Sequence, residues 1–395
     1  MELMIVLVLM LIILSAVFAL MRGTITTANT NYEMTAAGQS LRNAQEFINR
    51  DALVVGDGIK DVSNIWIPTS FATRFLTVRS ANSLDPSNRG FISTGAIISD
   101  DNVPAGTNVL NANPATTVLP LSDRVTMLSI DPTFSPIPLP GNFANPSTGQ
   151  ITIPGGDTSA FSVGEIYYLS GSGNGAFGTI TSINSGAIFW QEGDAFALNF
   201  FGASGNIATT TGADGNLPAT LMRVNMVHYF VDATGKLMRR VFGTKNAGFV
   251  DSVIAEHLDK LQFRYTLKPE TQGVIHAQPI SQINLSDAAL VRMIEPEVSV
   301  ETARALQNGE KYQVEGSTQI GIRNLQFGEA PVPRDAEGNT NLPNPGPTPN
   351  ITPTPTPSST PPPTPIPTPS PVATPTPMPS PSPSATPIPS PSPTP

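Results

Sequence analysis

Hydrophobic and polar positions divide the chain into stretches with different patterns. From Leu3 to Met21 every residue except Ser15 is apolar, and as a helix this run spans roughly 28 Å, close to the hydrocarbon thickness of a bilayer. From Leu41 apolar residues recur at helical spacing, and beyond Gly56 they form short runs broken by Gly, Pro, Asn and Ser. The pattern predicts a membrane-spanning helix, an amphipathic continuation and a β-rich body.

The amphipathic continuation carries two separate stripes. The apolar stripe is Leu41, Ala44, Phe47 and Ile48, and the charged stripe is Arg42, Glu46 and Arg50. The preceding residues 23–39 include Gly23, four threonines by Thr30 and two asparagines, which are poor helix formers, so we expect this stretch to be deformable. An unbroken helix from Leu3 to Leu53 would be about 75 Å long, with its first half in lipid and its second half against a domain.

The body contains β-type runs of alternating and β-branched residues. The strands that the pattern predicts are Asp123 to Ile130, Glu165 to Ser170, Phe177 to Ile183, Arg223 to Val231, Lys236 to Phe242, Leu261 to Leu267 and Ser317 to Leu325. The tetrapeptide "DATG" at 232–235 suits a hairpin turn between two of them. We therefore expect a mostly antiparallel sheet.

Other parts of the body have weaker patterns. Residues 83–121 and 132–154 are rich in Asn, Pro, Thr and Gly, and we interpret them as surface insertions. The segment 251–260 predicts a short helix capped by Asp251 or Ser252, and 287–306 is compatible with helix or strand. The fold class expected is α+β, with a long N-terminal helix packed on a mostly antiparallel β-rich domain and followed by a tail.

The tail has a composition of its own. Of the 41 prolines, 26 follow Ala330, and from Pro343 to Pro395 there is no Asp, Glu, Lys or Arg. Such a segment cannot bury a core, favours polyproline II and would reach on the order of 160 Å when extended. It serves either as a passive disordered spacer or as a stalk toward cell wall, a partner domain or sugar-modified Ser and Thr. The domains expected are 1–55, the helix; 56–330, a globular domain; and 331–395, the tail.

Composition and charge exclude several classes of functional site. Cysteine is absent, so disulfides, thiolate metal sites and Cys nucleophiles are excluded. The net charge is −9, and the densest basic cluster of the body is Lys236, Arg239 and Arg240. No nucleic-acid partner is therefore expected. We expect no cofactor.

No sequence motif indicates a catalytic site or a metal-binding site. The histidines at 228, 257 and 276 form no metal-binding pair, no Gly-x-Ser-x-Gly elbow occurs, and "GSGNG" at 171–175 fits a hairpin connection better than a phosphate loop. The acidic stretches "SDDN" at 99–102 and "EGDA" at 192–195 lack a calcium-binding ladder and predict solvated loops. Trp66 and Trp190 fit core packing. We therefore expect a protein that is not an enzyme.

Glu2 immediately precedes the apolar run. A carboxylate drawn toward the bilayer centre carries a penalty of ~2.5 to 3.5 kcal/mol, so it needs a partner unless it stays in the headgroup region. A secretory signal peptide is a further reading, but no Lys or Arg precedes the run, and the run exceeds the usual ~7 to 15 residues.

The start of the chain resembles a known family. "MELMIV" is similar to the part of the prepilin signature in which a glutamate precedes a continuous apolar run, as in type IV pilin-like proteins. The resemblance implies that Glu2 neutralises the N-terminal amine of a neighbouring subunit within the filament. Pairing with an ammonium would regain several kcal/mol at low effective dielectric. The signature's cleavage glycine, phenylalanine and basic leader do not precede Met1, and we expect the true start to lie several codons upstream.

Further blocks resemble the PilW-type, or PulJ-like, minor pilins. "QEFINRDALVVGDG", with the pair Arg50 and Asp51 and the turn at Gly56, is similar to that group's helix end, and scattered strand blocks follow in the same order. The resemblance implies a subunit that assembles into, or primes, a type IV pilus or type II secretion pseudopilus. Its packing stripe and anchor would be Leu3, Ile5, Leu9, Ile13, Val17 and Met21.

The same resemblance implies partners and location. A prepilin peptidase would cut and methylate the precursor, and other pilins, an inner-membrane assembly platform and membrane lipid would surround the helix. The subunit would cross the inner membrane once with its body outside. Two alternatives stay open: a membrane-tethered adhesin or binding protein with a Pro-rich spacer, and an anchored extracellular enzyme.

Overall fold

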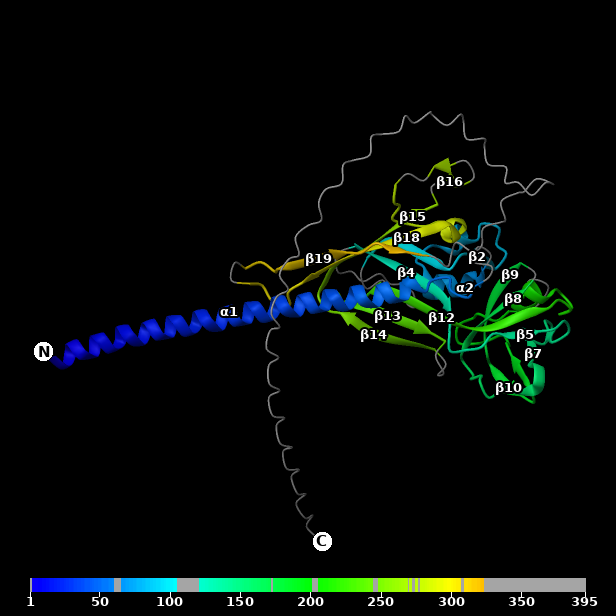
Figure 1. Cartoon of the computed structure of the whole chain (residues 1–395), viewed down its shortest axis with the longest axis horizontal. Coiled ribbons are helices and arrows are strands. Elements are labelled where there is room, and N and C mark those ends of the chain that lie inside the picture. The colour runs from blue at the N-terminus through cyan, green and yellow to red at the C-terminus, as the bar shows by residue number, and fades with distance from the viewer. Residues whose placement is uncertain are drawn as a thin grey trace, which may run out of the picture. The chain divides into compact units, whose positions relative to one another are not determined.

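The computed structural model describes residues 2–59, 65–104, 121–171, 173–200, 205–243, 248–268, 270–271, 274–275, 278–306 and 309–322. The chain divides into a unit of residues 1–332 and a second unit of 333–395. The tail predicted for 331–395 lies outside the described residues. The described part has the expected class: a long N-terminal helix packed on a mostly antiparallel β-rich domain (Figure 1).

Helix α1 (Glu2–Leu53) is continuous over 52 residues. The stretch 23–39, which we expected to be a poor helix, is helical throughout. Threonine hydroxyls in and beside it donate to the carbonyl four residues earlier, as from Thr24 to Leu20 (3.0 Å) and from Thr26 to Arg22 (2.7 Å). These bonds satisfy hydroxyls that would otherwise compete for the backbone in non-helical conformations.

The largest sheet is built around one long central strand. In the described part of the chain its path runs β14-β13-β12-β8-β9-β1-β2, with β4 and β5 also paired to β12, β3 paired to β4, and β1–β9 as its one parallel pair. Its strands are β1 (Ile65–Pro68), β2 (Phe91–Thr94), β3 (Ile97–Pro104), β4 (Leu121–Ile130), β5 (Ile137–Leu139), β8 (Ile166–Gly171), β9 (Asn174–Thr179), β12 (Ala219–Val231), β13 (Leu237–Phe242) and β14 (Phe249–Ala255).

Three smaller sheets complete the described strands. One comprises β6 (Ala144–Asn145), β7 (Gln150–Thr152), β10 (Ser182–Asn184) and β11 (Ala187–Phe189); another comprises β15 (Leu258–Leu267), β18 (Val291–Glu301), β19 (Gln313–Ser317) and β20 (Ile320–Gly321); the third pairs β16 (Glu270–Thr271) with β17 (Val274–Ile275). Short helical segments connect strands: α2 (Thr69–Phe71), η1 (Ala72–Leu76), α3 (Ala81–Leu84), η2 (Pro154–Gly156), α4 (Asn206–Thr211) and η3 (Leu285–Leu290).

The hairpin between β12 and β13 confirms the turn predicted at 232–235. Asp232 N donates to Lys236 O at 3.0 Å, and Gly235 adopts a φ of 75°, which glycine tolerates best. The antiparallel register then places Tyr229 opposite Arg239 and Val227 opposite Val241. This register determines which side chains meet the end of α1.

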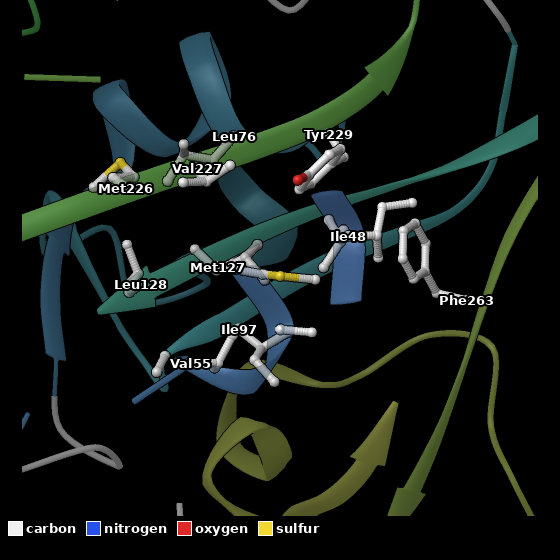
Figure 2. Packing of buried hydrophobic residues seen from close by; sticks show 14 of the residues in the cluster. Ile48, Val55, Leu76, Ile97, Met127, Leu128, Met226, Val227, Tyr229 and Phe263 are labelled. Atoms are coloured by element: carbon white, nitrogen blue, oxygen red, sulfur yellow. The ribbon is translucent and has the colours of Figure 1, made fainter. Parts of the chain in front are cut away.

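The core lies between α1, the largest sheet and the β15–β18 sheet. Ile48 of α1 packs in the same buried cluster as Met127, Tyr229 and Phe263, and Figure 2 shows these side chains together. A second cluster around Tyr167 and Trp190 lies away from the helix, between β8 and the β7–β11 strands. The expectation that Trp190 packs in the core is confirmed, since the residue is 1% exposed.

Several local predictions are wrong. Residues 83–121 and 132–154 contain β2, β3, β5, β6 and β7, and the buried Ile97 and Ile98 place β3 within the largest sheet rather than in an insertion. Residues 105–120 lie outside the described part. The segment 251–260 is not a helix but the end of β14, a tight turn with His257 at a φ of 55°, and the start of β15.

Two predicted strands are broken in the structure. The run 177–183 divides into β9 and β10, because the backbone changes partner: Ile180 N donates to Glu165 O, whereas Thr181 N donates to Phe189 O of the smaller sheet. The run 317–325 yields the end of β19 and the two-residue β20, and 323–325 lie outside the described residues. The ambiguous segment 287–306 supplies the end of η3 and the strand β18.

Candidate functional site

Among the described residues, no side chain from Leu3 to Met21 in the first half of α1 is buried. The residues predicted as anchor and packing stripe are all exposed: Leu3 77%, Ile5 60%, Leu9 55%, Ile13 64%, Val17 56% and Met21 56%. The helix is long and apolar enough to cross a membrane, and none of its most apolar stretch is buried. Glu2 is the first residue of this helix. Its side chain lies outside what the structure describes.

The predicted stripe residues occupy more than one side of the helix. Ile5, Leu9, Ile13, Val17 and Met21 follow one another at intervals of four and form a slowly turning stripe, whereas Leu3 lies on the opposite side from Ile5. Apolar residues also fill the positions between them. The segment is therefore apolar all round, as lipid or surrounding helices require.

The second half of α1 is held by the body along one face. Leu41, Ala44, Ile48 and Ala52 are buried, with Ala44, Ile48 and Ala52 at 0% exposure. The charged stripe of Arg42, Glu46 and Arg50 faces solvent. Both predicted stripes are confirmed, and together they orient the helix on the sheet.

Asp51 attaches the end of the helix to the sheet. Its carboxylate accepts a hydrogen bond from Tyr229 Oη at 2.6 Å and two from Arg239, from Nε at 2.6 Å and Nη2 at 3.2 Å. Burial and the Asp51 carboxylate raise the pKa of the Tyr229 hydroxyl above its ordinary value, so this group remains a proton donor. We name Asp51, Tyr229 and Arg239 the helix clamp.

Arg50 differs from its neighbour Asp51. Its side chain is 60% exposed, lies 3.5 Å from the Asp51 carboxylate and covers the ring of Phe47. Such an exposed pair adds little stability. The resemblance to minor pilins had singled out Arg50 and Asp51 together, but the structure divides their roles.

The sequence analysis did not predict that the clamp's other two residues form a site with Asp51. Tyr229 and Arg239 lie 178 and 188 residues after Asp51, so no local pattern connects them. A usable signal was present in the predicted 232–235 hairpin, because its register places Tyr229 directly opposite Arg239. No pattern in the sequence indicates that α1 ends next to Tyr229 and Arg239.

The turn after α1 fixes the helix end a second time. Gly56 adopts a φ of 75°, and its N–H donates to Leu128 O of β4 at 2.8 Å. At the next residue, Asp57 O accepts from Ile130 N at 2.9 Å. The small residue at Gly56 is therefore needed for a backbone connection from the helix to β4.

The acidic stretch at 99–102 is not the solvated loop we expected. Asp100 is 2% exposed and accepts hydrogen bonds from Thr77 Oγ1 at 2.6 Å and Val78 N at 2.8 Å, and it pairs with Arg79. Strand β3 carries it inward because β3 pairs with β4. In "EGDA", Asp194 accepts from the backbone of Phe196, Leu198 and Asn199 and so closes its own loop.

Asp123 joins the two sheets that enclose the helix. Its Oδ2 accepts from Phe263 N of β15 at 2.6 Å, and its Oδ1 accepts from Asn102 N at 3.0 Å. Burial raises the pKa of Asp123 to about 7, a rise that the two backbone hydrogen bonds oppose and the charge of Asp101 reinforces. The junction between the sheets therefore contains a titratable group.

The histidines have structural surroundings. His228 is buried, with Nδ1 2.9 Å from Thr126 Oγ1, and burial lowers its pKa well below the ordinary value, as do Arg124 and Arg240. His257 forms a turn, and His276 lies outside the described residues. Over the described ranges, no group of three or more His, Asp or Glu side chains could hold a metal ion. The "GSGNG" prediction is confirmed as the β8–β9 hairpin.

Comparison with known proteins gives neither a matching family model nor a matching curated protein.

Proposed function

We propose that this protein is a minor pilin or pseudopilin, a structural subunit rather than an enzyme, which assembles through α1 into, or primes, a type IV pilus or type II secretion pseudopilus. The observation that carries the proposal is the division of one continuous 52-residue helix into an exposed apolar half and a half built into a β-rich domain. A subunit that moves from membrane to filament needs such a helix.

The free energy gained by burying apolar side chains favours an apolar environment for the first half of α1. Burying one Leu, Ile, Val or Met side chain contributes about 1.5 to 3 kcal/mol, and Leu3 to Met21 contains many of them. Lipid tails meet this demand before assembly. The apolar helices of neighbouring subunits meet the same demand inside a filament, so one surface serves both states.

Glu2 would set the register between subunits. A carboxylate at the start of an apolar helix is costly without a partner, and the ammonium terminus of an adjoining subunit is a suitable one. Other pilins, an inner-membrane assembly platform and a prepilin peptidase are the partners that this role needs. The body would lie outside the inner membrane.

The experiment is a substitution at Glu2 in the full-length chain. We expect Glu2→Ala to remain in the membrane after alkaline extraction, because the apolar run is intact, but to be lost from sheared filaments. Glu46→Ala, which removes another exposed carboxylate of the same helix, is the matched control and should be incorporated like wild type. Equal incorporation of the Glu2→Ala variant and wild type would contradict the proposal and favour a tethered binding protein.

A further inference from the structure

Two strands of the body have an edge without a hydrogen-bonding partner. Among the described strands, β14 pairs only with β13, and β19 pairs only with β18. Both lie at the surface, since Val250 and Val253 of β14 are 50% and 48% exposed, and alternate residues of β19 are exposed. Neither strand contains proline or lysine, with which proteins often block an exposed edge. Such edges are templates for pairing with another strand.

The ladder between β13 and β14 shows which backbone groups of β14 point away from the body. Gly243 N donates to Gly248 O at 3.2 Å. Hydrogen-bonded pairs alternate along an antiparallel ladder, so the N–H and C=O groups of Phe249, Asp251 and Val253 point away from β13. Within the described part of the chain, no hydrogen bond uses these groups.

The ladder between β18 and β19 gives the same result for β19. Thr302 N donates to Tyr312 O at 2.9 Å, just before the first pair of these strands. By the same alternation, the N–H and C=O groups of Gln313, Glu315 and Ser317 point away from β18. These groups are also without a hydrogen bond among the residues that the structure describes.

Helix α1 lies between the two free edges. It contacts β14 as well as β18 and β19, and Figure 1 shows β14 on one side of the helix and β19 on the other. Gly316 of β19 lies against Gln45, where a Cβ atom would meet the amide of that side chain. Ser252 of β14 lies opposite Arg239, which binds Asp51. The edges therefore flank the second half of the helix.

The two strands run in opposite directions along α1. The connection before β19 lines a pocket with Glu33, and Gly316 is reached later, so β19 runs toward the C-terminal end of the helix. Strand β14 starts at Phe249, in the same cross-strand row as Leu128, which binds the turn after the helix, and then runs back along α1. Two copies with parallel α1 helices can therefore pair β14 with β19 in the antiparallel sense.

The membrane helix excludes the simplest alternative, in which two β14 strands pair with each other. A two-fold axis would relate two such antiparallel strands, and it would also turn their α1 helices in opposite directions. Two apolar runs that point in opposite directions do not enter one bilayer from the same side. Pairing of β14 with β19 keeps the helices parallel, and a head-to-tail contact of this kind repeats into an open filament.

The side chains of the two edges are compatible. On both strands the residues with outward backbone groups turn their side chains away from α1, so paired strands keep matching faces. Each acidic residue is paired within its own sheet, Asp251 with Arg240 at 2.7 Å and Glu315 with Lys260 at 3.6 Å. A register with Val253 opposite Glu315 also avoids placing the two carboxylates directly opposite each other.

We propose that β14 of one subunit pairs with β19 of a second copy of this chain in the assembled filament, with Val253 opposite Glu315. The inference rests on the proposed function, which places the α1 helices of neighbouring subunits side by side. Two strands of this length bury too little area to hold two proteins together alone. The apolar helices supply the remaining contact, and the strands fix how adjacent bodies meet.

The pairing implies a stagger between neighbouring subunits. Ser252 is level with Asp51, whereas Gly316 is level with Gln45, about 9 Å closer to the apolar run along the helix. The copy that supplies β19 therefore stands about 9 Å farther from the membrane. A shift of this size would draw about six apolar residues out of a bilayer. The strands consequently pair in the filament and not between two fully inserted chains.

Cysteine cross-linking in filaments of the full-length chain tests the pairing, since the chain contains no cysteine. The double variant Val253→Cys/Glu315→Cys places its two thiols on opposite sides of α1, but between paired copies their Cα atoms lie about 5.5 Å apart, within disulfide range. We expect oxidation to give a ladder of multimers on non-reducing gels. Neither single variant should give a ladder, and dimers of the Val253→Cys variant would contradict the pairing.

A backbone variant tests the hydrogen bonds themselves. Val253→Pro removes one outward N–H and leaves the ladder to β13 intact, so its unfolding midpoint should stay close to that of wild type. Its incorporation into sheared filaments should fall about fivefold, the effect of one lost hydrogen bond. Val253→Thr keeps the N–H and is the matched control, which should be incorporated like wild type.

The wild-type chain separates this inference from the proposed function. Its absence from filaments would overturn both. A chain that enters filaments but gives no ladder from the double variant, or equal incorporation of Val253→Pro and Val253→Thr, would overturn the strand pairing alone.

Discussion

The two halves of α1 differ in how many apolar residues they contain and in how those residues are distributed around the helix. The first half is apolar on every side and, among the described residues, is exposed along its apolar run, whereas the second half is apolar on one stripe and buries it against two sheets. A narrow stripe fits a helix that the body holds, and an apolar surface on all sides fits a helix that needs an outside partner.

The largest effect should come from the buried stripe. Ile48→Ala removes a fully buried side chain next to Met127 and Tyr229 and should lower the free energy of unfolding of the domain by ~2 to 5 kcal/mol. Ile12→Ala, at an exposed position of the first half, is the control and should leave the unfolding midpoint in detergent unchanged. Equal losses from both would show that the halves do not differ in packing.

A smaller effect should come from the helix clamp. Asp51→Ala leaves the Arg239 charge and the Tyr229 hydroxyl without their partner and should cost ~2 to 4 kcal/mol in chemical unfolding. The clamp is not completely buried, since the Arg239 side chain is 18% exposed, which keeps the expected loss below that of a fully buried pair. Arg50→Ala should cost less than ~1 kcal/mol, because that side chain faces solvent. A larger loss for Arg50→Ala than for Asp51→Ala would contradict the division of roles.

The smallest effect is a pH dependence confined to the body. Because the pKa of Asp123 is raised to about 7, the folded state holds this proton more tightly than the unfolded state. The contribution to stability is complete below the ordinary pKa and is lost as pH rises from about 4 to about 7. In urea unfolding over this range, we expect the free energy of unfolding of wild type to fall more than that of Asp123→Asn.

Retention of the first half in vesicles should not follow that change. The apolar run from Leu3 to Met21 contains no titratable group, so alkaline-extraction resistance should be the same for protein incubated at pH 5 and at pH 8. A parallel loss of stability and membrane retention would show that the two halves depend on each other more closely than their contacts indicate.

The fold was predictable where the local pattern and the tertiary environment agree. Long alternating runs such as 223–231 form strands as expected, and the helix stripes are correct. Strands β2 and β3 were missed because Asn, Pro and Gly around them indicate turns, whereas the pairing of β2 with β1 and of β3 with β4 decides their conformation. The break between β9 and β10 depends likewise on a change of partner sheet that no local pattern reveals.

The site was predictable to a lesser extent. The apolar run identifies the projecting half, because a segment that no body residue covers is recognisable from its own composition. Asp51 was noticed through a resemblance, but its partners lie far away in the chain and depend on where α1 ends over the sheet.

Helix α1 continues unbroken through its threonine-rich stretch, so a single helix connects its exposed apolar half to the body. From Met21 to Ala37, the first buried helix residue, the rise is about 24 Å. Each residue inserted there would move the domain about 1.5 Å along the helix axis and rotate it by about 100° around that axis. An insertion of seven residues would move it about 10 Å with little net rotation. The number of residues in this stretch therefore sets both the distance of the domain from the apolar half and its orientation around the helix axis.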